Sequence, residues 1–215
     1  MKKEDLGHLR KTYLKGSLGP KEIKDDPISF FKEWFRQADL SPEIEEANAM
    51  TLSTLGLDNF PKGRVVLLKS LTDEGFVFYT NYQSEKALGI EHHSKVGISF
   101  FWPILERQVI IKGEAFKLEA KISDVYFKSR PKGSQIGAIV SDQSKVITDR
   151  SIIEAKQEAL EIEYTNKNIE RPEHWGGYLV KPISIEFWQG RPNRLHDRIR
   201  CQLQGNFWNI ERLAP

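Results

Sequence analysis

The feature that most constrains the fold is a series of short strand-like runs, with turn-forming residues between several of them. Five such runs follow one another between residues 49 and 118, with turn-forming pairs such as Glu74-Gly75 between them. Strands joined in this way form antiparallel hairpins, because a parallel pair needs a long crossover connection. The five runs are Ala49–Leu55, Arg64–Leu71, Phe76–Tyr82, Lys95–Trp102 and Gln108–Leu118. They predict an antiparallel sheet or barrel rather than a doubly wound parallel sheet.

Helices are expected before and after these strands. Asp26-Pro27 combines an N-cap residue with a proline at the first helical position, and an apolar helix face follows to about Ala38. The remaining expected elements are helices at Ala120–Ser129 and Ser151–Tyr164 and strands at Gly177–Trp188, Leu195–Leu203 and Phe207–Leu213. The predicted fold class is mainly β with flanking helices (α+β), in a single domain over residues 26–215. Residues 1–25 are charged and poor in large apolar side chains, and we expect them to form a mobile N-terminal arm.

Composition excludes several classes of protein. Lys and Arg number 32 against 30 Asp and Glu, a formal net charge of only +2, which argues against a protein that mainly neutralises nucleic-acid phosphate. The single cysteine, Cys201, cannot form an intramolecular disulfide. The histidines are scattered except for His92-His93, an expected exposed helix end, so no metal site is predicted. The N-terminus turns polar at once, and the most apolar stretch is too short to span a bilayer, so we expect a cytoplasmic protein.

Two clusters of basic residues stand where predicted elements end. Arg64 and Lys69 flank an apolar strand, but a regular pleat puts them on opposite faces, so exposed strand ends explain them unless the strand bulges. Tyr126 and Arg130 share a helix face, and Ser134 follows the proline that stops that helix. A hydroxyl, a guanidinium and free backbone N–H groups suit a phosphate monoester. An ordinary helix stop with surface charges explains the second cluster equally well.

The third cluster is harder to explain by packing. On a strand, Arg194, His196 and Arg198 lie two residues apart and therefore share one face. Three potential cations on one face repel one another unless an anion or a polar ligand sits among them. Two fixed cations beside His196 also favour its neutral form. We therefore predict a ligand-binding role here. Gln108, inside an apolar run, is a further candidate because a buried amide needs partners.

Taken in order, these motifs resemble the pyridoxine/pyridoxamine 5′-phosphate oxidase family of FMN-dependent enzymes. The resemblance covers about Leu9 to Pro215. Its specific parts are Arg64-Val-Val-Leu-Leu-Lys69, Phe78-Tyr-Thr-Asn81, Leu105-Glu-Arg-Gln108, Ser129-Arg-Pro131, Ser134-Gln-Ile-Gly137, Trp175-Gly-Gly177, Glu186-Phe-Trp-Gln-Gly190, Arg194-Leu-His-Asp-Arg198 and Arg212-Leu-Ala-Pro215. The resemblance implies a split β-barrel and a homodimer with one FMN in each of two clefts between the subunits.

The resemblance also implies an activity and a set of site residues. The enzyme would oxidise pyridoxine or pyridoxamine 5′-phosphate to pyridoxal 5′-phosphate, by hydride transfer from C4′ to flavin N5 with dioxygen reduced to hydrogen peroxide. By the same resemblance, FMN would be bound by Arg64, Val66, Leu67, Lys69, Tyr79, Thr80, Lys86, Gln108, Gln143, Ser144, Trp188 and Arg198. Substrate would be bound by Arg10, Tyr13, Lys69, Tyr126, Arg130, Ser134, Arg194 and His196, and the last two would be catalytic. Arg10 and Tyr13 match a mobile segment that closes over the ligand.

One position departs from the family pattern. The family usually has a basic residue before Lys86, where this chain has Glu85. An anionic side chain near a phosphate weakens binding unless it turns outward, so we expect FMN to be held less tightly than in a typical member. Two other functions remain open, a non-catalytic FMN or pyridoxal-phosphate carrier and a nucleic-acid-binding barrel. The Arg194 and His196 face argues against the carrier, and the near-neutral charge argues against the nucleic-acid module.

Overall fold

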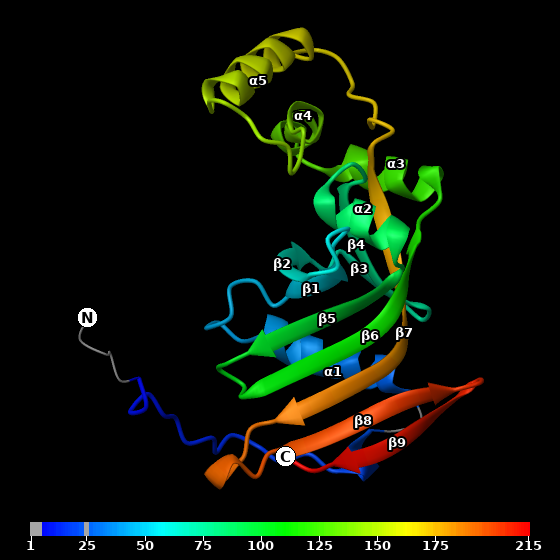
Figure 1. Cartoon of the computed structure of the whole chain (residues 1–215). Helices are drawn as coiled ribbons and strands as arrows, with labels where there is room; N and C mark the ends of the chain where they lie inside the picture. Colours follow the sequence, from blue (N-terminus) through cyan, green and yellow to red (C-terminus); the bar gives the residue numbers. More distant parts are fainter. Residues whose placement is uncertain (1–5, 24–25) are drawn as a thin grey trace. The chain divides into compact units, whose positions relative to one another are not determined.

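The structure is a computed structural model that describes residues 6–23 and 26–215 (Figure 1). Its elements, in chain order, are η1 (Pro20–Glu22), α1 (Pro27–Asp39), β1 (Ala49–Leu55), β2 (Pro61–Leu67), β3 (Ser70–Thr72), β4 (Gly75–Asn81), α2 (Glu85–His92), β5 (Lys95–Trp102), β6 (Arg107–Lys117), α3 (Ala120–Ser129), α4 (Lys132–Val140), α5 (Ser151–Glu163), β7 (Trp175–Gln189), η2 (Pro192–Arg194), β8 (Asp197–Gln204) and β9 (Phe207–Leu213). Over the described ranges, no helix is both long enough and apolar enough to cross a membrane.

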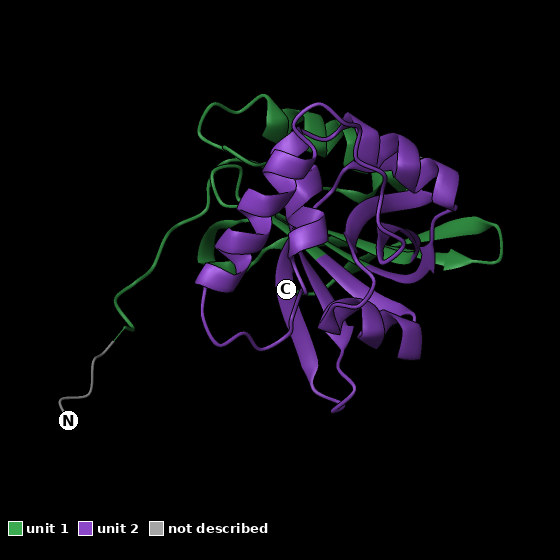
Figure 2. Ribbon diagram, turned by 90° about the horizontal axis from the view of Figure 1, so that it is seen from above, with its two compact units in different colours: residues 1–48, 99–111, 183–215 green, residues 49–98, 112–182 purple. Residues whose placement is uncertain are grey.

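The chain divides into two compact units, which Figure 2 colours separately. Unit 1 consists of residues 1–48, 99–111 and 183–215, and unit 2 consists of residues 49–98 and 112–182. The hydrogen-bonded strand order is β2-β1-β5-β6-β7-β4-β3, with β8 paired to β7 and β9 paired to β8. Strands β5, β6 and β7 each contribute residues to both units.

The strands of unit 2 pair antiparallel. β1 pairs with β2 in the register Leu52↔Arg64, and β4 pairs with β7 in the register Tyr79↔Gly177. The predicted Glu74-Gly75 turn is confirmed, since β3 and β4 form a hairpin there. Gly75 has φ 148°, and a Cβ at this position would lie 2.0 Å from the carbonyl oxygen of Val180. Only glycine fits this turn without distortion.

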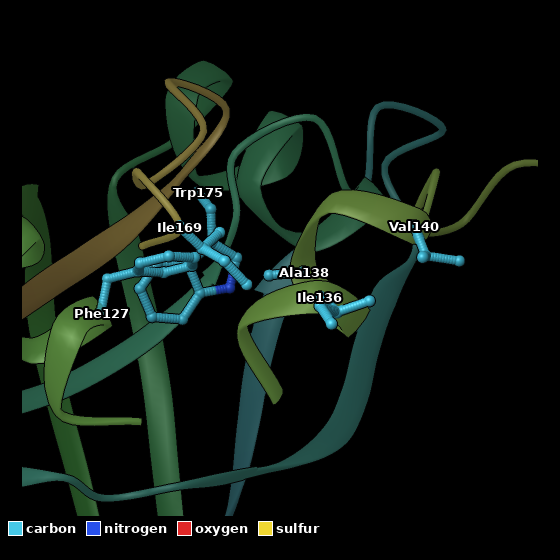
Figure 3. Packing of buried hydrophobic residues seen from close by; sticks show 6 residues of the cluster. All are labelled: Phe127, Ile136, Ala138, Val140, Ile169 and Trp175. Atoms are coloured by element: carbon cyan, nitrogen blue, oxygen red, sulfur yellow. The ribbon is translucent and has the colours of Figure 1, made fainter. Parts of the chain in front are cut away.

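Helices α3 and α4 of unit 2 share a small hydrophobic core (Figure 3). Its buried members are Phe127, Ile136, Ala138, Val140, Ile169 and Trp175. Phe127 of α3 and Trp175 of β7 meet edge to face with ring centroids 5.3 Å apart, a favourable aromatic geometry. This core holds the corner between α3 and α4, which contains Arg130 and Pro131.

Unit 1 is organised around α1, which the sequence predicts. The Asp26 carboxylate accepts hydrogen bonds from the backbone N–H groups of Ile28 and Ser29, as an N-cap should. The buried face of α1 includes Phe31 and Trp34. Unit 1 also contains the β8–β9 hairpin, whose register runs from Arg198↔Leu213 to Gln204↔Phe207.

Several expectations need correction. The run predicted at 64–71 is two strands, since β2 begins at Pro61 and ends at Leu67 and β3 begins at Ser70. Helix α4 was not predicted, and of α2 only the end at His92-His93 was predicted, because Gly89, Gly133 and Gly137 lower the helix propensity of their segments. The exposed helix end at His92-His93 is confirmed, since α2 ends there and both side chains are exposed.

The strand predicted at Leu195–Leu203 begins only at Asp197. Arg194 instead ends the short η2 turn and has φ 62°, a left-handed conformation that a strand residue does not adopt. The prediction that Arg194, His196 and Arg198 share one strand face is therefore wrong. Pro192 and the left-handed residues beside it turn the chain before β8 begins.

Candidate active site

Unit 2 contains a cavity of about 650 Å³. Volumes of this size are typical of small-ligand and cofactor sites. Ten of the residues predicted from the sequence line it: Val66, Leu67, Lys69, Tyr79, Thr80, Lys86, Tyr126, Arg130, Ser134 and Gln143. They come from β2, β4, α2, α3, α4 and the loops beside them, so the fold of unit 2 gathers them from distant parts of the sequence.

One group of polar residues, called here the lysine cluster, consists of Arg64, Thr80, Lys86 and Gln143. The Lys86 ammonium donates to Gln143 Oε1 at 2.7 Å and to Thr80 Oγ1 at 3.2 Å. The Arg64 guanidinium donates to Thr54 Oγ1 at 2.7 Å. These acceptors are uncharged. Burial and the nearby Arg64 lower the pKa of Lys86 to about 8, although Glu85 opposes the shift. Two neighbouring cations on neutral acceptors are suited to a bound anion.

Glu85 is turned toward the outside of the lysine cluster. Its carboxylate bonds to the ammonium of Lys62, which also lies 3.1 Å from Asp58 Oδ2. The Glu85 side chain remains half exposed at 52%. Its backbone N–H donates to Ser144 Oγ at 3.2 Å, and Ser144 lines a second cavity of about 340 Å³ beside these residues. The expected interference of Glu85 with an anion is therefore reduced by its own ion pair.

A second group, called here the arginine cluster, consists of Tyr79, Tyr126, Arg130 and Trp175. The Tyr79 ring stacks on Tyr126 at 3.9 Å and on Trp175 at 5.5 Å between centroids. The Arg130 guanidinium lies 4.5 Å from the centre of the Trp175 ring, within cation–π range. Its Nη1 atom is buried without a hydrogen-bond partner among the described residues. A buried unpartnered guanidinium is costly, and an anionic ligand in the cavity would satisfy it.

The break between β2 and β3 resolves the difficulty that the pleat raised for Lys69. Because β2 ends at Leu67, Lys69 lies outside the regular strand, where its backbone N–H donates to Val77 at 2.8 Å. Its side chain lines the cavity. Ser134 lies in the first turn of α4 and also lines the cavity. Burial raises the pKa of Tyr126, so its hydroxyl remains a hydrogen-bond donor.

Unit 1 contains a separate set of predicted residues, called here the ring cluster: Tyr13, Trp188 and His196. Ring centroids lie 4.6 Å apart for Trp188 and His196, 5.6 Å for Tyr13 and Trp188, and 5.7 Å for Tyr13 and His196. The backbone N–H of Arg191 donates to His196 Nδ1 at 3.1 Å, which assigns the ring proton to Nε2 in the neutral form. Burial and the positive charge of Arg194 lower the pKa of His196. The predicted neutral histidine is supported, although burial is the larger cause.

Two of the remaining predicted residues of unit 1 lie next to the ring cluster: Arg198 is the strand partner of Trp188 in the β7–β8 register, and Arg194 acts on His196 through its charge. Arg198 is ion-paired with Glu186 at 2.8 Å, and this pair raises the pKa of Arg198. Arg194 is exposed, and Gln108 is half-buried in β6. Arg10 is exposed and bonds to the carbonyl oxygen of Gly7 at 2.9 Å.

Comparison with known proteins shows the family to which this chain belongs. Residues 37–163 match the family model described as pyridoxamine 5′-phosphate oxidase, and residues 175–215 match the one described as the pyridoxine 5′-phosphate oxidase C-terminal dimerisation region. The chain belongs to the pyridoxamine 5′-phosphate oxidase family. The resemblance seen in the sequence is confirmed.

Relatives in this family match the whole chain. The pyridoxine/pyridoxamine 5′-phosphate oxidase of Flavobacterium psychrophilum is 56% identical over 213 residues, which cover 99% of this chain and 100% of that protein. The protein of the same name from a Cyanothece species is 49% identical over 210 residues, 98% of each chain. Among solved structures, PhzG from Burkholderia lata in complex with tetrahydrophenazine-1-carboxylic acid has a TM-score of 0.86 at 28% identity, over 91% of this chain and 96% of that chain.

The pyridoxamine 5′-phosphate oxidase family fixes the fold class. The predicted class, a mainly antiparallel split β-barrel with flanking helices, is confirmed, and the described part of the chain supplies five α-helices to it. A pyridoxamine 5′-phosphate oxidase-related, FMN binding protein from Nostoc punctiforme has the same fold, with a TM-score of 0.69 at 13% identity.

FMN, the cofactor that the pyridoxamine 5′-phosphate oxidase resemblance implies, can be tested against the cavity. A phosphate dianion needs cationic donors. Lys86 lines the cavity and bonds to neutral acceptors, and Arg64 is a cationic neighbour of Lys86 that is not itself among the lining residues. A flat ring needs apolar surface and backbone groups, and Val66 and Leu67 at the end of β2 line the same cavity. The residues present fit FMN. Over residues 6–23 and 26–215, no group of three or more His, Cys, Asp or Glu is arranged to hold a metal ion.

Two residues that make important contacts in the structure, Trp175 and Glu106, were not predicted from the sequence to have a role. Trp175 lies under Arg130, and its motif was noted only as part of the resemblance. Glu106, two residues before Gln108 in the sequence, is buried at 2% exposure beside Gln189. The argument applied to Gln108, that a polar group in an apolar stretch needs partners, would have identified Glu106 as well.

Proposed function

We propose that the protein is an FMN-dependent oxidase that converts pyridoxine 5′-phosphate or pyridoxamine 5′-phosphate to pyridoxal 5′-phosphate. The observation that supports this proposal best is the presence of two anion-seeking clusters on one cavity of unit 2. The lysine cluster offers Lys86 on neutral acceptors, and the arginine cluster offers a guanidinium nitrogen without a partner. A cofactor and a substrate that each carry a phosphate would occupy both.

In this proposal the lysine cluster binds the FMN phosphate. Arg64 and Lys86 neutralise the dianion, Thr80 and Gln143 hold the Lys86 ammonium in place, and Tyr79 lies close by. Val66 and Leu67 would support the flavin ring together with Gln108. Ser144, Trp188 and Arg198 would complete the flavin site, some of them from the partner chain. When bound, FMN would supply the hydride acceptor for the substrate C4′ at flavin N5, and dioxygen would take up the two electrons and two protons as hydrogen peroxide. For pyridoxamine 5′-phosphate, water would then hydrolyse the imine left by the oxidation and release ammonia.

The arginine cluster binds the substrate phosphate in the same proposal. Arg130 and Lys69 supply positive charge, while Tyr126 and Ser134 supply hydroxyl donors. Anchoring this remote phosphate fixes the reacting carbon and converts binding energy into positioning. Lys69 would also lie near the flavin, where its positive charge would stabilise the negative charge of the reduced cofactor.

The ring cluster covers the substrate ring. His196, held neutral by Arg191 and burial, and Arg194 contact the reacting substituent, and Arg10 and Tyr13 close over the ligand. The family's C-terminal dimerisation region, matched over residues 175–215, supports a homodimer in which the two chains contribute to each site. We place this enzyme in the cytoplasm, in the synthesis and salvage of vitamin B6.

The test is peroxide release by the FMN-loaded protein, with pyridoxine 5′-phosphate and with unphosphorylated pyridoxine. The proposal predicts turnover of the phosphate ester with a kcat/KM about a hundredfold or more above that of the free vitamin, since a charge-assisted phosphate anchor is worth a few kcal/mol. Equal rates would contradict phosphate anchoring. FMN binding with no peroxide from either phosphate ester would point instead to a non-catalytic carrier.

A further inference from the structure

A buried carboxylate in unit 1 faces the N-terminal segment. Glu106, in the turn before β6, is 2% exposed. Its Oε2 atom accepts the backbone N–H groups of Leu14 at 2.7 Å and Lys15 at 2.9 Å. Its Oε1 atom lies 3.5 Å from the ammonium of Lys11. All three partners belong to one short stretch of the N-terminal segment, about ninety positions away in the sequence.

The backbone of Glu106 is fixed independently of that segment. Its carbonyl oxygen accepts the N–H of Gly190 at 2.7 Å and the side-chain amide of Gln189 at 3.2 Å. Glu106 has φ 56°, a left-handed conformation that is unfavourable for a glutamate and persists only where the surroundings impose it. The carboxylate is therefore presented to the N-terminal segment by a rigid support.

A buried carboxylate is costly unless hydrogen bonds and charge compensate it. Burial raises the pKa of Glu106, but the N–H groups of Lys15 and Leu14 and the charge of Lys11 outweigh burial and hold the pKa below its ordinary value. Residues 11–15 therefore supply the hydrogen bonds and the positive charge that offset the cost of burying the ionised Glu106 side chain. If that segment leaves, the carboxylate loses all of these partners at once.

The same contacts fix the place of Tyr13. Tyr13 directly precedes Leu14, and its ring packs against Trp188 at 5.6 Å and His196 at 5.7 Å. Gly190 makes room for it, since a Cβ there would lie 2.7 Å from Tyr13 Cγ. The next contacts along the segment do not involve Glu106, because Gly16 accepts from Arg191 at 2.8 Å and Leu18 donates to Asp197 at 3.0 Å.

We propose that Glu106 is a positioning residue that holds residues 11–15 in place and thereby sets Tyr13 against Trp188 and His196. The consequence for catalysis rests on the proposed function, in which the ring cluster covers the substrate. The contacts of Gly16 and Leu18 confine the effect, so loss of Glu106 releases the chain up to Lys15 and leaves it attached from Gly16 onward.

The test is amide hydrogen exchange of the FMN-loaded full-length enzyme, measured by mass spectrometry on peptides that cover residues 10–16 and 17–23. Glu106→Ala should raise exchange over 10–16 by about tenfold or more, because two amides lose their acceptor, and leave 17–23 unchanged. Glu106→Gln keeps one acceptor oxygen but places an amide group among N–H donors and an ammonium, so it should give a smaller rise. Glu22→Gln is the matched control, since Glu22 accepts the N–H of Gly19 in the same segment and does not contact Tyr13.

Steady-state kinetics gives the second readout. KM for pyridoxine 5′-phosphate should rise about fivefold or more in Glu106→Ala, with little change in kcat. In Glu106→Gln, KM should rise less than in Glu106→Ala. Should Glu106→Ala fail to fold, Glu106→Gln carries both measurements.

Unchanged exchange over residues 10–16 in the folded Glu106 variants would overturn the proposal. An enzyme with altered exchange and no oxidase activity even in the wild type would leave the role of Glu106 standing and refute the proposed function instead.

Discussion

The cavity of unit 2 and the ring-cluster region of unit 1 handle charge in opposite ways. In the cavity, Lys86 bonds to neutral oxygens and Arg130 has a buried nitrogen with no partner among the described residues. In unit 1, Arg198 is paired with Glu186, and Arg212 is paired with Asp197. Paired charges hold a fold together, whereas buried unpaired charges in a cavity await a ligand. The comparison supports the proposal in which unit 2 binds the phosphates and the ring cluster covers the substrate.

Arg194 is the exception within unit 1, and it offers the largest effect. Over the described residues it has no carboxylate within ion-pair distance, and it lies beside His196. Arg194→Ala should lower kcat about a hundredfold while FMN affinity stays at the wild-type value, since in the proposal the arginine touches substrate and not cofactor. Peroxide release and an FMN titration on the same preparation check this. Full activity in this variant would remove Arg194 from the site.

The next effect concerns the arginine cluster. Arg130→Ala should raise KM for pyridoxine 5′-phosphate about thirtyfold or more, because a charge-assisted bond to the phosphate is worth about 2 kcal/mol. FMN affinity should not change. Lys128→Ala is the control, since Lys128 is exposed and faces Glu170. If the two variants behave alike, the buried nitrogen of Arg130 is not a phosphate anchor.

The lysine cluster predicts a pH dependence of FMN binding. Because the pKa of Lys86 is lowered to about 8, the apoprotein loses this charge as pH rises through that value, whereas a bound phosphate would keep the amine protonated. FMN affinity should therefore be constant between about pH 6.5 and 7.5 and fall by about tenfold per pH unit above 8, until the pKa of the bound form is reached.

Fluorescence quenching of FMN across this range measures the effect. Lys86→Arg is the control, because a guanidinium keeps its charge throughout. An identical fall in affinity in Lys86→Arg would assign the titration to another group.

The smallest effect concerns Glu85 and its ion pair. Lys62→Ala should weaken FMN binding about threefold, because the Glu85 carboxylate loses its ion pair and repels the phosphate. The effect is small because solvent screens the exposed carboxylate. Lys62→Ala combined with Glu85→Gln should return to the wild-type affinity, and Glu85→Arg should bind FMN more tightly than the wild type. No gain in Glu85→Arg would reject the idea that Glu85 weakens the site.

The sequence predicted those elements whose signals are local. Asp26-Pro27 marked the start of α1, and Ala49–Leu55, Lys95–Trp102 and Phe207–Leu213 were predicted with the bounds that the structure has. α4 was missed because Gly133 and Gly137 weaken its helical pattern, while its stability comes from the core around Trp175.

The candidate site was predicted where residues lie in recognisable motifs and missed where a contact joins distant segments. Lys69, Tyr126 and Arg130 were predicted and line one cavity. The prediction that Arg194 and His196 share one strand face was wrong. Arg194 has a left-handed φ in a turn, and the alternation of side chains along a strand cannot predict such a turn. The contact of Glu106 with Leu14 spans 92 positions and leaves no local pattern.

Titration of the apoprotein with FMN tests the central claim most directly. If the lysine cluster of unit 2 is a phosphate site, the protein will take up about one FMN per chain, quench its fluorescence and lose affinity when Arg64 and Lys86 are both replaced by methionine. Riboflavin, which lacks the phosphate, will bind to the wild type about a hundredfold more weakly than FMN does. To the double variant, riboflavin and FMN will bind with equal affinity. A protein that binds FMN and riboflavin equally well, or neither of them, contradicts the account.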